Sequence, residues 1–188
     1  MSASPIEEGR AALRAGDPAA ARRAFERALA EGGSGAALEG LGEALYLEHL
    51  YVAAAATYER AYAAYRAERQ SLAAGRVART LAWVTGNVLG DWAVRSGWLA
   101  RARSILEEAG TDRPEHGWVL IIRSISEPDA AVREALLREA IAIGRRFGDP
   151  DVEFMAVAYL GGVFVMVDRV EEGWSSATRR WRRCAPAS

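Results

Sequence analysis

The sequence predicts an all-α protein built from about five antiparallel helix pairs. The first observation is an internal repeat, because the stretch beginning at Gly42 aligns position by position with the stretch beginning at Gly9. The second is composition: alanine and arginine, both strong helix formers, are abundant, and lysine is absent. The third is that no segment sustains the alternation of apolar and polar residues typical of a strand.

The two repeats match small residues with small residues and an aromatic with an aromatic. The matched positions are Gly9 with Gly42, Ala21 with Ala54, Phe25 with Tyr58, and Ala28 with Ala61. Small residues let two helices cross closely, and the aromatic ring fills the space beside the crossing. A helical pair cannot bury its apolar face alone, so we expect the pairs to stack into a right-handed superhelix.

Turn and capping residues set the helix boundaries in chain order. Gly16-Asp17-Pro18 supplies a C-terminal glycine, an N-cap aspartate and a proline at the first helical position. Similar breaks follow at Gly90-Asp91, at Glu127-Pro128-Asp129 and at Gly148-Asp149-Pro150-Asp151. The expected helices span about residues 5–15, 18–32, 35–48, 51–68, 71–89, 91–109, 115–126, 129–147, 151–167 and 170–183.

The third pair departs from the period, because the interval from Ala61 to Ala102 is longer than the interval from Ala28 to Ala61. The later pairs match more loosely. The most apolar run, 154–167, is too short for a membrane span and predicts a buried core helix. We therefore expect one repeat domain over residues 1–188, with an irregular tail from about Trp174.

The repeats resemble tetratricopeptide repeats, through the small-residue and aromatic pattern described above. More narrowly, they look like the helical region of large LuxR/MalT-type transcriptional regulators of actinobacteria. Four stretches carry this resemblance: Leu41–Ala67, Gly97–Glu108, Glu115–Ser124 and Gly144–Glu153. The resemblance implies a role in sensing or signal relay. DNA binding is not implied, because in those regulators it belongs to a separate C-terminal domain.

The tail, WSSATRRWRRCAPAS, does not match the Ala- and Leu-rich helix that this resemblance leads us to expect. Reading back-translated GC-rich codons one frame over from Gly173 restores a sequence of the expected kind. We hypothesise a frameshifted or shortened regulator gene.

Composition excludes several functional classes. The net charge of -1 argues against a general electrostatic affinity for nucleic acid or for acidic membrane surfaces. A single cysteine, Cys184, suits a reducing compartment, and the acidic N-terminal segment is unlike a secretory signal. A cytoplasmic protein with no direct nucleic-acid or membrane partner is expected.

The sequence does not predict an enzyme. His49 and His116 are far apart, so with one cysteine they cannot supply metal ligands at the usual spacing. His49 occupies a turn where glycine is usual. There is no phosphate-binding loop, and Gly161-Gly162 lies inside an apolar helix, where we expect it to serve packing. We expect no metal and no cofactor.

Four of the tryptophans fall into two groups, according to the helix on which each is expected. Trp92 and Trp98 fall on faces expected to pack between helix pairs. Trp83 and Trp118 lie on first helices of their pairs, which line the concave face of such arrays. These two are the better candidates for ligand contact, although a core position is the alternative.

The most economical function is a non-enzymatic binding or scaffold module. Its concave groove would capture a peptide, a partner helix or a small effector. The first-helix positions that map to this groove are Arg10, Glu43, Tyr46, Asn87, Arg123 and Tyr159. The alternative is an effector-sensing fragment of a LuxR-type regulator without its DNA-binding domain.

The C-terminal helices suggest a second contact surface. An apolar helix over 154–167 would be followed by a tail without leucine or valine. Either the tail folds back over this surface, or a second copy covers it in a homodimer.

Overall fold

The computed structural model describes residues 3–108, 110 and 112–171. All regular structure in this part of the chain is helical. Backbone contacts divide the chain into two compact units, Met1–Ile105 and Leu106–Ser188. Each unit is described by itself below. The prediction of a single repeat domain stays a prediction, and the tail from about Trp174 lies outside the described residues.

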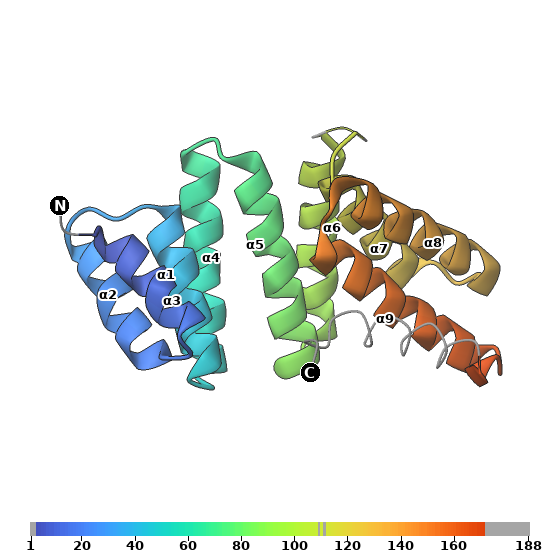
Figure 1. The fold of residues 1–188 in the computed structure, drawn as a ribbon, viewed down its shortest axis with the longest axis horizontal. Coiled ribbons are helices and arrows are strands. Elements are labelled where there is room, and N and C mark those ends of the chain that lie inside the picture. Colours follow the sequence, from blue (N-terminus) through green and yellow to red (C-terminus); the bar gives the residue numbers. More distant parts are fainter. Residues whose placement is uncertain (1–2, 109, 111, 172–188) are drawn as a thin grey trace, which may run out of the picture. The chain divides into compact units, whose positions relative to one another are not determined.

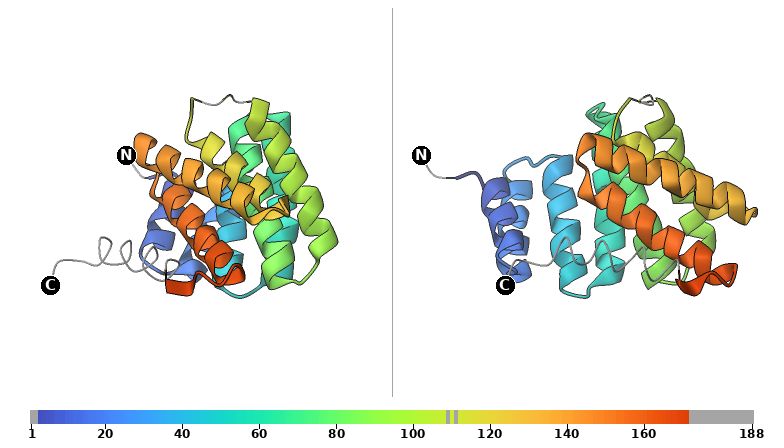
Figure 2. Two further views of the ribbon diagram at one scale, coloured as in Figure 1. Left: turned by 90° about the vertical axis from the view of Figure 1, so that its right-hand side faces the viewer. Right: turned by 45° about the vertical axis from the view of Figure 1, so that its right-hand side comes forward.

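The first unit is a series of helices, and each of the first five packs antiparallel on its neighbour (Figure 1). They are α1 (Pro5–Arg14), α2 (Pro18–Ala30), α3 (Gly35–Leu47), α4 (Tyr51–Ala67), α5 (Ser71–Trp83), the π-helix η1 (Val84–Val88) and most of α6 (Trp92–Glu108). The second unit contains α7 (Glu115–Ser126), α8 (Ala130–Phe147) and α9 (Pro150–Met166). In Figure 2, α8 and α9 lie side by side in both views.

If α5 and η1 are taken together as the fifth helix, the predicted helix boundaries are confirmed to within two residues for the first nine helices. Of the tenth, only Val170 and Glu171 lie within the described range, and both are helical. One difference is local: residues 84–88 form a π-helix and not a continuation of α5. In it the Leu89 N–H donates to the Val84 carbonyl, five residues back, at 3.0 Å. Such turns add one residue to a helix and occur often at functional sites.

Aspartate caps account for the accuracy of these boundaries. The Asp17 carboxylate accepts from the Ala20 N–H at 2.8 Å, and Asp91 accepts from the Val94 N–H at 3.0 Å. Asp129 and Asp149 do the same at the starts of α8 and α9. The preceding turns use left-handed backbone: Gly148 ends α8 at φ 66°, and His49, in the expected turn, has φ 62°. Each device satisfies otherwise unpaired helix-end amides within a few residues of sequence.

The repeat positions match because an aromatic ring lies on a glycine of a neighbouring helix. A Cβ added at Gly9 would lie 2.7 Å from the Phe25 ring, and one added at Gly42 would lie 2.8 Å from the Tyr58 ring. Gly40 also contacts the Phe25 ring. Phe25 and Tyr58 are both buried in the core of the first unit. The ring and the glycine are thus one packing device used twice.

Two expectations about packing are wrong. Trp92 is the first residue of α6 and is 58% exposed. Its ring does not pack in the core of the first unit; the Arg95 guanidinium lies 5.1 Å from the ring centroid. A Cβ added at Gly161 or Gly162 would meet no atom within 4 Å, so these glycines do not permit a close approach. Trp98 does pack on the core of the first unit, with the Tyr62 ring centroid 5.1 Å from its own.

Ala54→Leu should lower the free energy of unfolding by about 1–3 kcal/mol, because overpacking a tight core forces strain. Ala54 is fully buried on α4, whereas the adjacent Ala53 is exposed. Ala53→Leu is therefore the matched control and should leave stability nearly unchanged. Thermal unfolding followed by circular dichroism measures both. Equal midpoints for wild type and Ala54→Leu would contradict the repeat register.

Candidate functional site

The first unit holds a cavity of about 310 Å³ between α3, α4 and α5. This is the lower end of the size range of small-ligand sites. Three of its lining residues are aromatic and four are charged. The lining residues are Glu39, Glu43, Tyr46, Tyr58, Arg76, Arg79, Thr80, Trp83 and Val84. Of these, Trp83 is the last residue of α5 and Val84 is the first residue of η1.

One wall is a closed ion-pair network centred on Glu39. The Arg76 guanidinium donates Nε to Oε1 of Glu39 at 2.8 Å and Nη2 to Oε2 at 2.7 Å, which is a bidentate pair. The Tyr65 hydroxyl donates to the same Oε2 at 2.6 Å. Burial, and then this hydrogen bond, raise the pKa of Tyr65. The Glu39 carboxylate is therefore fully engaged and ties α3 to α4 and α5.

Glu43 lies one turn further along α3, on the same face as Glu39. Although Glu43 is an exposed residue, partial burial raises the pKa of its carboxyl, and the charge of Glu39 raises it further. Among the described residues, none forms a hydrogen bond or ion pair with its carboxylate. Glu43 thus differs from Glu39 in having no cationic partner.

The aromatic side chains come from three helices. Tyr58 is buried, and burial followed by the charges of Glu43 and Glu39 raises the pKa of its hydroxyl, so the ring stays neutral. The ring of Tyr46, which is partly buried, meets that of Tyr51 edge to face at a centroid distance of 5.4 Å. Trp83 is 44% exposed at the other side. The rings of Tyr46 and Trp83 are therefore accessible to an incoming group, whereas Tyr58 forms part of the core.

The six residues predicted for the groove lie in different places. Glu43 and Tyr46 line the cavity. Arg10 is exposed on α1, and Asn87, in η1, donates to the Trp83 carbonyl at 3.4 Å; neither lines the cavity.

Arg123 and Tyr159 belong to the second unit, on α7 and α9. Arg123 is exposed, and Tyr159 packs against the core of that unit. A single ligand-binding groove formed by all six residues stays a prediction. Of the two tryptophans singled out for ligand contact, Trp83 borders the cavity, and Trp118 packs on the second core.

Sequence reasoning did not predict Arg76 as a lining residue, although the repeat spacing places it at the position of two residues that were predicted. The interval from Glu43 to Arg76 equals the interval from Arg10 to Glu43, so all three occupy the same repeat position. This equivalence is concealed because the spacing of the small residues changes after the second pair. Glu39, Tyr58, Arg79 and Thr80 were also not predicted as lining residues.

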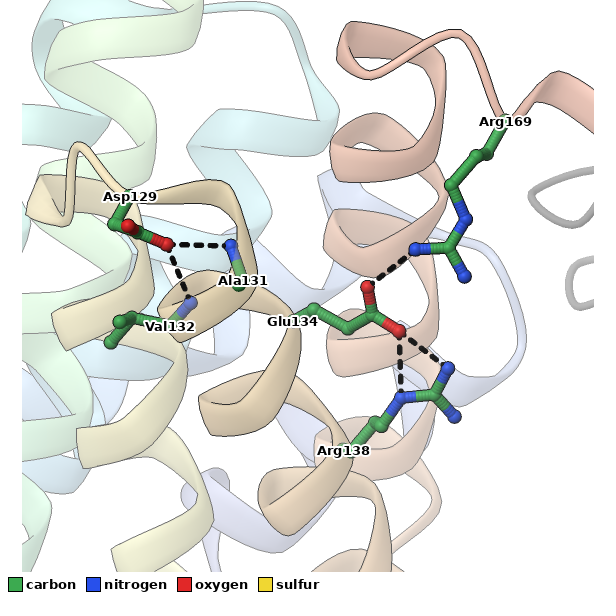
Figure 3. Close-up of polar contacts among 6 residues, drawn as sticks. All are labelled: Asp129, Ala131, Val132, Glu134, Arg138 and Arg169. Atoms are coloured by element: carbon green, nitrogen blue, oxygen red, sulfur yellow. Dashed lines mark hydrogen bonds and ion pairs between the residues drawn. The ribbon is translucent and has the colours of Figure 1, made fainter.

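The second unit contains a separate polar cluster, which is structural (Figure 3). Glu134 accepts from Arg138 Nη2 at 2.6 Å and from Arg169 Nη1 at 2.8 Å. The hydrogen bond from Arg138, and then that from Arg169, hold the pKa of Glu134 below its usual range. The guanidinium carbons of Arg169 and Arg138 lie 4.6 and 6.0 Å from the ring centroid of Phe164. The cluster fastens α8 to the end of α9.

The last turn of α9 exposes apolar side chains. Val165, Met166 and Val167 are exposed, whereas Val163 and Phe164 are buried. Arg133 Nη1 contacts the Met166 sulfur at 3.4 Å. The exposed side chains agree with the expected apolar surface, and homodimerisation through it stays a prediction.

Neither a metal site nor a membrane span is found in the described residues. They contain no group of three or more histidine, cysteine, aspartate or glutamate side chains that could hold a metal ion. No helix among them is both long enough and apolar enough to cross a membrane.

Comparison with known proteins identifies the fold. No family model matches the chain, and no curated protein matches it. Among solved structures, BtubC (BKLC) from P. vanneervenii superimposes with a TM-score of 0.69 and 16% identity, covering 93% of this chain and 76% of that one. A putative kinesin light chain from Podosopora anserina, with nearly identical TPR-like repeats, gives a TM-score of 0.63 and 13% identity, covering 98% and 96%.

The chain therefore has an all-α, tetratricopeptide-like repeat fold, as the sequence predicted. At this level of identity the likeness concerns the fold alone. Neither structure is described as a LuxR/MalT-type regulator, so that narrower resemblance and an actinobacterial origin stay expectations.

Proposed function

We propose that this protein is a protein-interaction scaffold whose first unit binds a peptide or partner helix at the cavity between α3, α4 and α5. The observation that carries the proposal is the lining of this cavity. Tyrosine, tryptophan and arginine, the residue types that dominate binding energy at interfaces, converge there from three helices. Tetratricopeptide-like repeats provide rigid surfaces for such partners.

A peptide side chain suits the cavity better than a free effector. Small-molecule sites usually enclose most of the ligand surface. Here Trp83 is nearly half exposed, and Glu43 also reaches solvent. The cavity has room for one large side chain, while the backbone of the partner lies outside. An effector-sensing fragment of a LuxR-type regulator stays an expectation from the resemblance alone.

Filling the cavity should abolish peptide binding. Short peptides selected on the wild-type protein from a display library should bind Thr80→Trp about tenfold more weakly or worse, because the indole occupies the site. Ala53→Trp adds the same ring at an exposed position of α4 outside the cavity and should bind as wild type does. Isothermal titration calorimetry measures each affinity. Equal affinities for the wild type and Thr80→Trp would place the binding surface elsewhere.

A small effector would give a different outcome in the same experiment. The selection would then return no peptide that competes at the cavity. Small-molecule binding lost in Thr80→Trp but kept in Ala53→Trp would support an effector site.

A further inference from the structure

Glu43 is a carboxylate that has no cationic partner among the described residues, in a cavity lined by aromatic rings. It lines the cavity together with Tyr46, Tyr58 and Trp83. The charge of Glu43 is also one of the causes of the raised pKa of the Tyr58 hydroxyl, after burial. Glu43 is exposed in the free protein, so a partner segment that covers the cavity would desolvate its carboxylate. A positive charge arriving with that segment would offset this cost.

The two arginines that line the cavity do not supply this positive charge to Glu43. Arg76 is held by both oxygens of Glu39. Arg79 has an interaction of its own. The groups that shift the pKa of Glu43 are its own burial and Glu39, both of which raise it. No arginine is among them, so no arginine of the described residues neutralises the negative charge of Glu43.

We infer that the cavity receives the side chain of an arginine from the partner segment, with Glu43 as the counter-ion and the rings of Tyr46 and Trp83 flanking the guanidinium. This inference rests on the proposed function and specifies the chemistry of its ligand. A cation is attracted both to a carboxylate and to the face of an aromatic ring, and most strongly to tryptophan. Arginine fits better than lysine because its planar guanidinium can stack on a ring while it donates two parallel hydrogen bonds to one carboxylate.

An acidic partner is disfavoured by the same contacts. To bind Arg76, an incoming carboxylate would have to displace Glu39 from a bidentate pair that the Tyr65 hydroxyl also supports. It would also approach the uncompensated charge of Glu43. An incoming guanidinium breaks no contact of the described residues at Glu43.

The test uses two probes that differ in charge but hardly in shape. N-acetyl-arginine amide carries the guanidinium, and N-acetyl-citrulline amide replaces it with a neutral urea group. Titration followed by NMR, with the indole N–H of Trp83 as reporter, should give the arginine probe about tenfold higher affinity. In Glu43→Gln this preference should fall several-fold, and what remains would come from the aromatic rings. Glu59→Gln, at an exposed glutamate of α4 outside the cavity, is the matched control and should keep the preference.

A pH titration gives an independent readout. Only the ionised form of Glu43 attracts the probe, and the raised pKa means that this form is lost at higher pH than for an ordinary glutamate. The affinity of wild type for the arginine probe should therefore fall as the pH is lowered through that raised pKa. Glu43→Gln should show no such fall.

The outcomes separate this inference from the proposed function. Equal binding of the two probes to the wild type, preference for N-acetyl-glutamate amide, or no binding of the arginine probe would overturn the arginine pocket. Those comparisons need no variant, so they hold even if Glu43→Gln does not fold. The scaffold proposal would still stand if Thr80→Trp abolished binding of the selected peptides. Conversely, selected peptides indifferent to Thr80→Trp would refute the scaffold proposal, whatever the probes do.

Discussion

Phe25→Ala should lower the free energy of unfolding of the first unit by about 3–5 kcal/mol, the range for deleting a fully buried aromatic ring. Phe25 is completely buried and belongs to the core cluster of that unit. Its ring lies against Gly9 of α1 and Gly40 of α3, so its loss opens a cavity where three helices meet. The neighbouring glycines have no side chains that could rotate into the space.

Urea denaturation followed by far-UV circular dichroism measures this change. Trp92→Ala is the control within the same unit, because it removes a larger ring that is mostly exposed. It should cost far less than Phe25→Ala. Similar losses for the two variants would show that the ring-on-glycine contact does not organise the first core.

Phe164→Ala should destabilise the second unit to a similar extent, about 3–5 kcal/mol. Phe164 is 2% exposed on α9 and packs in the second core. Two guanidinium groups, of Arg138 and Arg169, also lie over its ring, and both are held there by Glu134 (Figure 3). Removing the ring therefore abolishes a hydrophobic contact and two cation–π contacts together.

Phe154→Ala is the matched control, because Phe154 lies on the same helix but is mostly exposed. It should change stability by much less, on the order of the changes usual for surface substitutions, within about 0.5 kcal/mol. Thermal unfolding followed by NMR, with the resolved indole N–H signal of Trp118 as reporter for the second unit, distinguishes the two variants. A loss as large in Phe154→Ala as in Phe164→Ala would mean that α9 presents its other face to the core.

Sequence alone predicted the local structure well, because the signals that end a helix act within a few residues. Asp17, Asp129 and Asp149 each bind a helix-end amide two or three positions further on. Gly16 and Gly148 provide the left-handed turns. The alignment of Phe25 with Tyr58 also predicted the tetratricopeptide-like fold, since the ring must lie beside a small residue in both repeats.

The π-helix and the exposure of Trp92 were not predicted. Apolar periodicity specifies neither a local change of helix type nor how much of a side chain at a helix start is covered. The same limitation affected the groove, where two of six predicted residues, Glu43 and Tyr46, reached the cavity.

By itself, the sequence determined the helices, their caps and the repeat that stacks them, because each depends on neighbouring residues or on a fixed period. Only the tertiary structure decided which side chains share the cavity. Arg76 reaches Glu39 across a long stretch of chain and neutralises that glutamate, whereas Glu43, one turn along, has no ion-pair partner among the described residues. That difference depends on the rotation of each helix about its axis, which is set by packing against its neighbours.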